Sequence, residues 1–215
     1  MKSDIGFLFD LDGVLIDSER EYTRIWTLID GLYPSGTDNF ARRIKGSTLD
    51  KILGEYYNDG DIREKVVELL YSEEKKMAYD YCPYAEQLLD ELDSRDIPHA
   101  LVTSSNEYKM GRLFSDLPGF RRHFIHIVDS SCVSRSKPDP EGYLKGASAL
   151  NVSPSRCVVF EDSVQGVMAG RAAGAYVIGV SGTVDASLLY PYADRIVDSL
   201  DQVDIDEISD ILRMR

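Results

Sequence analysis

Phe9-Asp10-Leu11-Asp12-Gly13-Val14, near the start of the chain, is the stretch that decides how the rest is interpreted. It continues the apolar run Ile5-Gly6-Phe7-Leu8-Phe9, which predicts a buried strand. A strand that ends in acidic residues points to a ligand beyond its carboxyl end, where open α/β sheets form their binding sites. Side chains two residues apart share one face of a strand, so one carboxylate can attack while the other moves a proton.

Short apolar runs alternate with amphipathic helical patterns from about residue 80 to the end of the chain. Strand–helix alternation predicts an α/β fold, a doubly wound parallel sheet with helices on both faces. The further expected strands are residues 99–103, 124–128, 157–160, 176–180 and 195–197. The expected helices are residues 84–95, 107–117, 140–150, 163–173 and 201–213.

Residues 18 to 80 interrupt this alternation, because they are charged, helical in pattern and without clear strands. Helices are expected over residues 19–29, 49–57 and 62–78. We interpret residues 17–81 as an inserted helical cap domain, and residues 1–16 with 82–215 as the α/β core domain. The two connections between them, near residues 15–18 and 79–83, are the expected hinge.

The composition limits the partners that this chain is expected to bind. A net charge of −13 argues against nucleic acid and anionic membranes. No apolar run approaches the roughly 20 residues of a membrane helix, and the N-terminus does not resemble a signal peptide. Three cysteines without close spacing predict reduced thiols. We therefore expect a cytoplasmic protein whose anion site is built locally, from a few basic groups, backbone N–H groups and a metal.

Polar residues follow several of the expected strands, and the carboxyl ends of parallel strands meet at one edge of a sheet. Taken singly, each group has a structural explanation: a helix cap for the hydroxyl and acidic groups, or a solvated loop for the lysine. Taken together and in this order, they favour a reaction site. The groups are Asp10 with Asp12, Thr103-Ser104-Ser105-Asn106, Ser136-Lys137-Pro138 in a loop, and Glu161-Asp162-Ser163.

These residues, in this order, resemble the motifs of the haloacid dehalogenase superfamily. The first motif is similar to the stretch from Asp10 to Ser18, the second to Thr103, the third to Lys137 with Pro138, and the fourth to Glu161-Asp162. The helical insertion lies where the superfamily places its first type of cap. The resemblance implies a Rossmann-like core. Relatives that cleave carbon–halogen or carbon–phosphorus bonds lack the second acid, so Asp12 favours phosphate chemistry.

The resemblance also implies a role for each matched residue. Asp10 would attack phosphorus and form an aspartyl-phosphate, and Asp12 would serve as general acid and base. Lys137 and Thr103 would stabilise the transferring phosphoryl group. The implied cofactor is Mg²⁺, with ligands from Asp10, the Asp12 carbonyl and Asp162, and with Glu161 close by. Residues expected to bind phosphate or substrate are Thr103, Ser104, Ser105, Asn106 and Lys137, together with Gly46 and Ser47 of the cap.

Within the superfamily, the motifs are most similar to β-phosphoglucomutase and small sugar-phosphate phosphatases. The mutase has a histidine where this chain has Tyr22, and an arginine where Lys45-Gly46-Ser47-Thr48 is followed by Leu49. That arginine holds the distal phosphate of a bisphosphate, so a mutase would need Arg42, Arg43 or Lys45 as a substitute. The resemblance therefore implies a Mg²⁺-dependent phosphatase acting on a small phosphorylated metabolite, a sugar phosphate.

Several alternatives stay open at this point. A phosphosugar mutase and a non-catalytic metabolite-binding protein are the rival functions, and we expect a monomer in each case. Lys75 and Lys76 either reach the substrate, as a cap lysine often does in the family, or form a solvated helix face. The three histidines, His99, His123 and His126, show no metal-ligand spacing and are expected to be structural.

Overall fold

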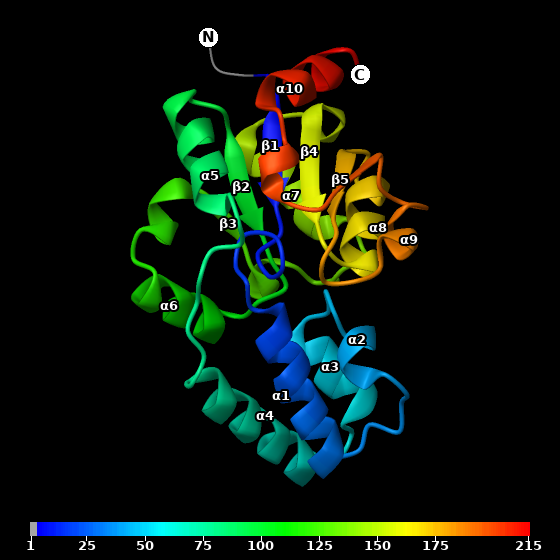
Figure 1. Cartoon of the computed structure of the whole chain (residues 1–215). Helices are drawn as coiled ribbons and strands as arrows, with labels where there is room; N and C mark the ends of the chain where they lie inside the picture. Colours follow the sequence, from blue (N-terminus) through cyan, green and yellow to red (C-terminus); the bar gives the residue numbers. More distant parts are fainter. Residues whose placement is uncertain (1–3) are drawn as a thin grey trace.

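The computed structural model describes residues 4–215, and a six-stranded parallel sheet forms its centre (Figure 1). The strand order is β3-β2-β1-β4-β5-β6. The predicted α/β class and the parallel sheet are therefore confirmed. The strands are β1 (Gly6–Phe9), β2 (His99–Val102), β3 (His126–Val128), β4 (Cys157–Glu161), β5 (Tyr176–Val180) and β6 (Arg195–Val197).

The strand order reverses its direction at β1, and this reversal determines where a ligand can bind. From β1 the chain goes to β2 and β3 on one side, then returns to place β4 on the other side. Such a switch point opens a crevice at the carboxyl ends of the two central strands. Phe9 pairs with Phe160, and the Asp10 amide donates to the Phe160 carbonyl at 3.0 Å. Asp10 and Glu161 consequently leave the sheet side by side.

Alternating side chains of the strands build two apolar layers, as strand geometry requires. Phe7, Phe9 and Phe160 stack on one face, where the rings of Phe9 and Phe160 are 4.7 Å apart. Helices α5 (Ala85–Ser94), α6 (Glu107–Asp116) and α10 (Ile205–Arg213) add apolar side chains to that layer. Leu8 points to the opposite layer, which α7 (Glu141–Leu150), α8 (Val164–Ala172) and α9 (Ala186–Leu189) complete.

Four helices between β1 and α5 lie together beyond the carboxyl ends of the strands, whereas α10 lies at the opposite end (Figure 1). They are α1 (Glu19–Leu32), α2 (Phe40–Arg43), α3 (Leu49–Tyr56) and α4 (Gly60–Glu74). Trp26 packs edge-on against Phe40 with ring centroids 5.8 Å apart, so it belongs to the apolar interior of this group.

The chain passes twice between this helical group and the sheet, and the two passages are hydrogen-bonded to each other. The amide of Cys82 donates to the Leu15 carbonyl, and the amide of Asp17 donates to the Asp80 carbonyl, each at 2.9 Å. The assignment of residues 17–81 to a separate domain stays a prediction.

Some helices and strands begin at residues other than the expected ones, and in one case a capping residue is the reason. The closing helix begins at Ile205 and not at residue 201, because the Asp204 carboxylate accepts hydrogen bonds from the amides of Asp206 and Glu207. The strand expected over 124–128 begins at His126. Helices α2 and α9 were not predicted, since four residues give too little periodicity to recognise.

Within residues 4–215, none of the helices has the length and apolar character that crossing a membrane requires.

Candidate active site

Asp10 lies at the centre of the site, just beyond the carboxyl end of β1. The Lys137 ammonium lies 2.5 Å from Asp10 Oδ1 and 2.6 Å from Glu161 Oε1. All three side chains are buried. Burial alone would lower the pKa of Lys137, but the carboxylates of Asp10 and Glu161 outweigh it and hold this pKa above its usual range. Lys137 therefore carries a fixed positive charge against the Asp10 carboxylate.

Glu161 is held in place by hydrogen bonds from three neighbouring side chains. Its Oε1 accepts from the Tyr143 hydroxyl at 2.6 Å as well as from Lys137. Its Oε2 accepts from the Ser163 hydroxyl at 3.0 Å. The first turn of α8 presses against the same carboxylate, since a Cβ on Gly166 would lie 1.8 Å from the Glu161 carboxyl carbon. Both oxygens of Glu161 thus accept hydrogen bonds within the core, and the bond from Lys137 fixes the position of the Lys137 ammonium.

Asp10, Glu161 and Asp162 together offer a set of oxygens that suits a divalent cation. One carboxylate oxygen from each lies within 4.8 Å of the others, and all three residues are buried. Burial raises the pKa of Asp10 to about 7, although Lys137 opposes this, and burial raises that of Asp162 well above its usual range. Asp162 Oδ2 has no hydrogen-bond donor of good geometry within residues 4–215, and the nearby Thr183 hydroxyl only partly offsets its burial.

This donor set fits Mg²⁺, which prefers carboxylate and carbonyl oxygens. The cluster contains three carboxylates, and the one lysine in it pairs with Asp10 and Glu161, so a divalent cation would balance the remaining negative charge. The backbone at Gly13 has a φ of +75°, and a Cβ there would lie 2.1 Å from Asp162 Oδ2. Only glycine therefore permits the chain after Asp12 to approach Asp162 this closely.

Asp12 has a different environment from Asp10, with three donors around its half-buried carboxylate. The Ser105 hydroxyl donates to Oδ2 at 3.1 Å, and the Ser18 hydroxyl donates to Oδ1. Lys109, from the first turn of α6, places its ammonium 2.5 Å from the same Oδ1. Asp12 is thereby held beside Asp10 in one orientation.

Lys109 is a site residue that the sequence analysis missed. It is buried, and its ammonium lies 4.0 Å from the centre of the Tyr22 ring. A signal existed in the sequence, because Lys109 occupies the helix face defined by Met110 and Leu113, where a solvated lysine is not expected. Tyr143, the partner of Glu161, was missed as well.

Some of the residues that directly follow β2 cap helix α6, and some line the cleft. A helix cap is present, but Asn106 provides it by accepting from the Lys109 amide, and not the hydroxyl groups before it as the structural explanation proposed. Ser104 and Ser105 nevertheless line the cleft, and the Ser104 hydroxyl donates to the Gly46 carbonyl at 2.9 Å. Thr103 is buried next to them, and its hydroxyl accepts from the Ser105 amide at 3.0 Å.

Gly46 and Ser47 lie where the helical group meets the sheet. The Ser47 hydroxyl donates to Gln165 Oε1 at 3.1 Å. Gly46 has a φ of +77°, and a Cβ there would lie 2.7 Å from the Ser163 hydroxyl oxygen. Both residues line the cleft, which puts them within reach of a molecule bound at Asp10.

Among the other basic residues considered for substrate contact, only Lys45 lines this cleft, and it forms an ion pair with Glu19 at 2.6 Å. Arg42 and Arg43 are exposed and line other hollows of the surface, outside this cleft. Lys75 and Lys76 are exposed, and Lys76 pairs with Glu73, so the solvated helix face is the correct explanation for them. The cleft wall from the helical group otherwise includes Tyr22, Thr23, Trp26, Ile44, Leu49, Ile52, Leu70 and Glu74.

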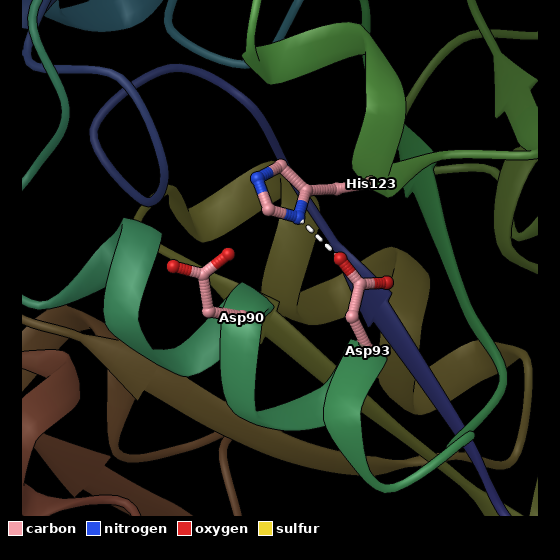
Figure 2. A group of neighbouring side chains, drawn as sticks. All are labelled: Asp90, Asp93 and His123. Atoms are coloured by element: carbon pink, nitrogen blue, oxygen red, sulfur yellow. Dashed lines mark hydrogen bonds and ion pairs between the residues drawn. The ribbon is translucent and has the colours of Figure 1, made fainter.

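A second group of metal-compatible side chains lies at the amino ends of the strands, away from this cleft. Asp90 and Asp93 from α5 and His123 bring their ligand-type atoms within 4.8 Å (Figure 2). His123 Nδ1 and Asp93 Oδ2 are 2.6 Å apart, and Arg122 donates to Asp90 at 2.9 Å. His99 also approaches Asp93, at 3.5 Å. These pairings engage both carboxylates, which agrees with a structural role for the histidines.

Comparisons of the sequence and of the structure with known proteins agree with one another. The sequence matches the haloacid dehalogenase-like hydrolases over residues 6–174. Hexitol phosphatase A of Escherichia coli is 33% identical over 205 residues, which cover 93% of either chain. A phosphorylated carbohydrates phosphatase of Thermotoga maritima is 32% identical over 174 residues, covering 78% of this chain and 80% of the other. The β-phosphoglucomutase of Clostridium difficile has a TM-score of 0.80 at 24% identity, covering 100% of this chain and 98% of that one, which shows a shared fold alone.

Proposed function

Since this chain belongs to the haloacid dehalogenase-like hydrolase family, we propose that it hydrolyses the phosphate ester of a small sugar-like metabolite, with Asp10 as nucleophile and Mg²⁺ as cofactor. The observation that carries this proposal is the Lys137 ion pair with Asp10 at the centre of a buried carboxylate cluster. The two relatives above that are at least 30% identical in sequence are phosphatases, and the chain is accordingly a phosphoric monoester hydrolase. Their substrates, a hexitol phosphate and phosphorylated carbohydrates, support a sugar phosphate here.

In the first half of the proposed reaction, an Asp10 carboxylate oxygen attacks phosphorus and the bond from phosphorus to the leaving oxygen breaks. Asp12 gives its proton to that oxygen, so the product leaves as an alcohol. In the second half, Asp12 takes a proton from water, the water oxygen attacks phosphorus, and the bond to Asp10 breaks. Inorganic phosphate is released and both aspartates return to their starting states.

The other residues of the site support these two steps by position and charge. Lys137 neutralises Asp10 and would donate to the phosphoryl oxygens, where preorganised donors have their greatest effect. We propose that Mg²⁺, held by Asp10, Asp162 and the Asp12 carbonyl, supplies charge neutralisation between the carboxylate and the phosphate. Glu161 would lie next to these ligands without binding the ion itself, because its oxygens already accept hydrogen bonds from Lys137, Tyr143 and Ser163.

We further propose that residues 17–81 form a cap that opens and closes about the paired segments at Leu15 and Cys82. The contacts of Gly46 and Ser47 with Ser104 and Gln165 would belong to the closed state. Closure would exclude bulk water while Asp10 attacks.

A phosphosugar mutase is supported less well, because it must hold a second phosphate at the cap side of the cleft. Lys45 is the candidate cation on that side, and Glu19 already pairs with it at 2.6 Å. Leu49 occupies the position where the mutase has its arginine. We therefore expect net phosphate release and not isomerisation.

The direct test is phosphate release from a panel of hexitol, hexose and pentose phosphates, with a hexose 1-phosphate included to detect isomerisation. We expect release from at least one sugar phosphate in the presence of Mg²⁺, and a loss of at least about 100-fold after chelation, because the ion neutralises transition-state charge. Restoring Mg²⁺ to the chelated sample is the control. Isomerisation without release would favour the mutase, and no turnover of any substrate would support a binding protein.

A second test follows from the raised pKa of Asp10. Between its usual 3.8 and about 7, the folded protein keeps a proton that the unfolded chain has lost. Raising the pH through that window therefore destabilises the metal-free fold. Mg²⁺ binds the ionised carboxylate, so it should stabilise more as the pH rises. We expect thermal unfolding to show a Mg²⁺-induced rise in Tm that is larger at pH 8 than at pH 5 by about 3 °C or more. A shift that is equal at both pH values would exclude this coupling.

A further inference from the structure

Glu74, the last residue of α4, has an unusual environment for a carboxylate. It lines the cleft but is only 4% exposed. Its Oε1 accepts from the Tyr22 hydroxyl at 2.8 Å. Its Oε2 is buried, and no donor for it exists in the part of the chain that the structure describes. Within the described residues, Oε1 of Glu74 therefore has a hydrogen-bond donor and Oε2 has none.

An unsatisfied oxygen of this kind is costly for the folded protein. Buried polar atoms nearly always have a partner, and the exceptions call for an explanation such as a ligand. Burial raises the pKa of Glu74, and the Tyr22 hydrogen bond only partly compensates for it. The neighbouring Glu73 provides a contrast, because its carboxylate pairs with Arg24 and Lys76.

A chain of contacts links Glu74, on the cleft wall from the helical group, to Asp12. The Tyr22 hydroxyl reaches Glu74, and the Tyr22 ring lies under the Lys109 ammonium at 4.0 Å. Lys109 in turn reaches Asp12 at 2.5 Å. In the proposed function Asp12 serves the leaving oxygen, so the organic part of the substrate would extend from Asp12 toward Glu74.

We propose that Glu74 is a specificity-determining residue whose free oxygen accepts a hydrogen bond from a hydroxyl group of the substrate's leaving part. This proposal rests on the proposed phosphatase function and narrows its substrate class to esters of polyhydroxylated alcohols. The donor is a neutral hydroxyl and not an ammonium, because positive groups already surround Glu74. Arg112 donates to its backbone carbonyl, and Lys109 lies against its partner Tyr22.

The experiment compares two substrates on the full-length protein with Mg²⁺: a hexitol phosphate, and 4-nitrophenyl phosphate, whose leaving group has no hydroxyl besides the one released. In Glu74→Met, an apolar side chain of similar length, we expect kcat/KM for the hexitol phosphate to fall about 10- to 100-fold, which is the typical effect of losing a hydrogen bond to a charged group. Most of the fall should be in KM, because the contact forms on binding. For 4-nitrophenyl phosphate we expect a change of less than about 3-fold, since no contact is lost there.

Two further variants make the outcome specific. Glu73→Met, on the same helix turn, should leave the ratio between the two substrates unchanged. Glu74→Gln keeps one acceptor, so it should lower the ratio of kcat/KM for the hexitol phosphate to kcat/KM for 4-nitrophenyl phosphate less than Glu74→Met does. If the methionine variant does not fold, a ratio in Glu74→Gln below that of the wild type supports the inference, and an unchanged ratio overturns it. An equal loss on both substrates, an unchanged ratio, or a preference for hexosamine over hexose phosphate would overturn the inference. Wild-type activity that still requires Asp10 would then leave the proposed function standing.

Discussion

Asp10→Asn is expected to reduce phosphate release by at least about 10⁴-fold, the scale seen when a covalent nucleophile is removed. The amide has almost the same shape as the carboxylate, so the cleft and the Lys137 loop should keep their structure. What it lacks is the negative oxygen that forms the bond to phosphorus. Substrate binding should survive, because the phosphate would still meet Lys137 and is no longer repelled by the Asp10 charge.

The matched control is Asp4→Asn, at the opposite end of the same segment, where the carboxylate is exposed and pairs with Arg156. It should keep full activity. Both variants are to be measured with the best substrate of the panel, directly after purification, so that deamidation does not restore Asp10. Activity of Asp10→Asn within about 10-fold of the wild type would exclude Asp10 as the nucleophile.

Lys137→Met is expected to lower kcat by about 10²- to 10³-fold, because it removes a preorganised donor to the transferring group. It should also destabilise the fold by about 3 kcal/mol, since Asp10 and Glu161 would remain buried without their shared cation. The destabilisation should be largest near pH 8 and smaller near pH 5, where Asp10 with its pKa of about 7 takes up a proton.

Urea unfolding of the metal-free protein at the two pH values measures this effect. Lys145→Met is the control, because Lys145 is about half exposed and pairs with Glu141 on the outside of α7. Its stability should differ from that of the wild type by less than about 1 kcal/mol. If Lys137→Met unfolds at the wild-type urea concentration at both pH values, the buried pair does not contribute as proposed here.

The sequence allowed the core of this molecule to be predicted because its signals are local. Buried strands such as Tyr176–Val180 are continuous apolar runs, and polar residues directly follow β1, β2 and β4. Parallel topology then brings Asp10 and Glu161 to one edge without further information. The Lys137 loop is the exception, because only the folded chain shows its ammonium inserted between those two carboxylates.

The missed residues depend on tertiary contacts that leave little trace in the sequence. Lys109 and Glu74 resemble ordinary charged positions of amphipathic helices until α4 and α6 face the same cleft. Lys76 shows the reverse case because, of the two alternatives left open for it, substrate contact or a solvated helix face, its surface ion pair with Glu73 favours the second. Whether a charged side chain near a helix end is solvated or functional is decided by packing between elements, which periodicity alone does not report.

The proposed mechanism requires the phosphoryl group to be bound covalently to Asp10 during turnover, and this aspartyl-phosphate can be trapped. The wild-type protein with Mg²⁺ is mixed with excess 4-nitrophenyl phosphate, quenched with acid within one turnover, digested and analysed by mass spectrometry. We predict one phosphoryl group on the peptide that contains Asp10, sensitive to hydroxylamine and missing in Asp10→Asn. Stoichiometric nitrophenol release with an unmodified Asp10, or a phosphoryl group on another residue, would exclude Asp10 as the nucleophile.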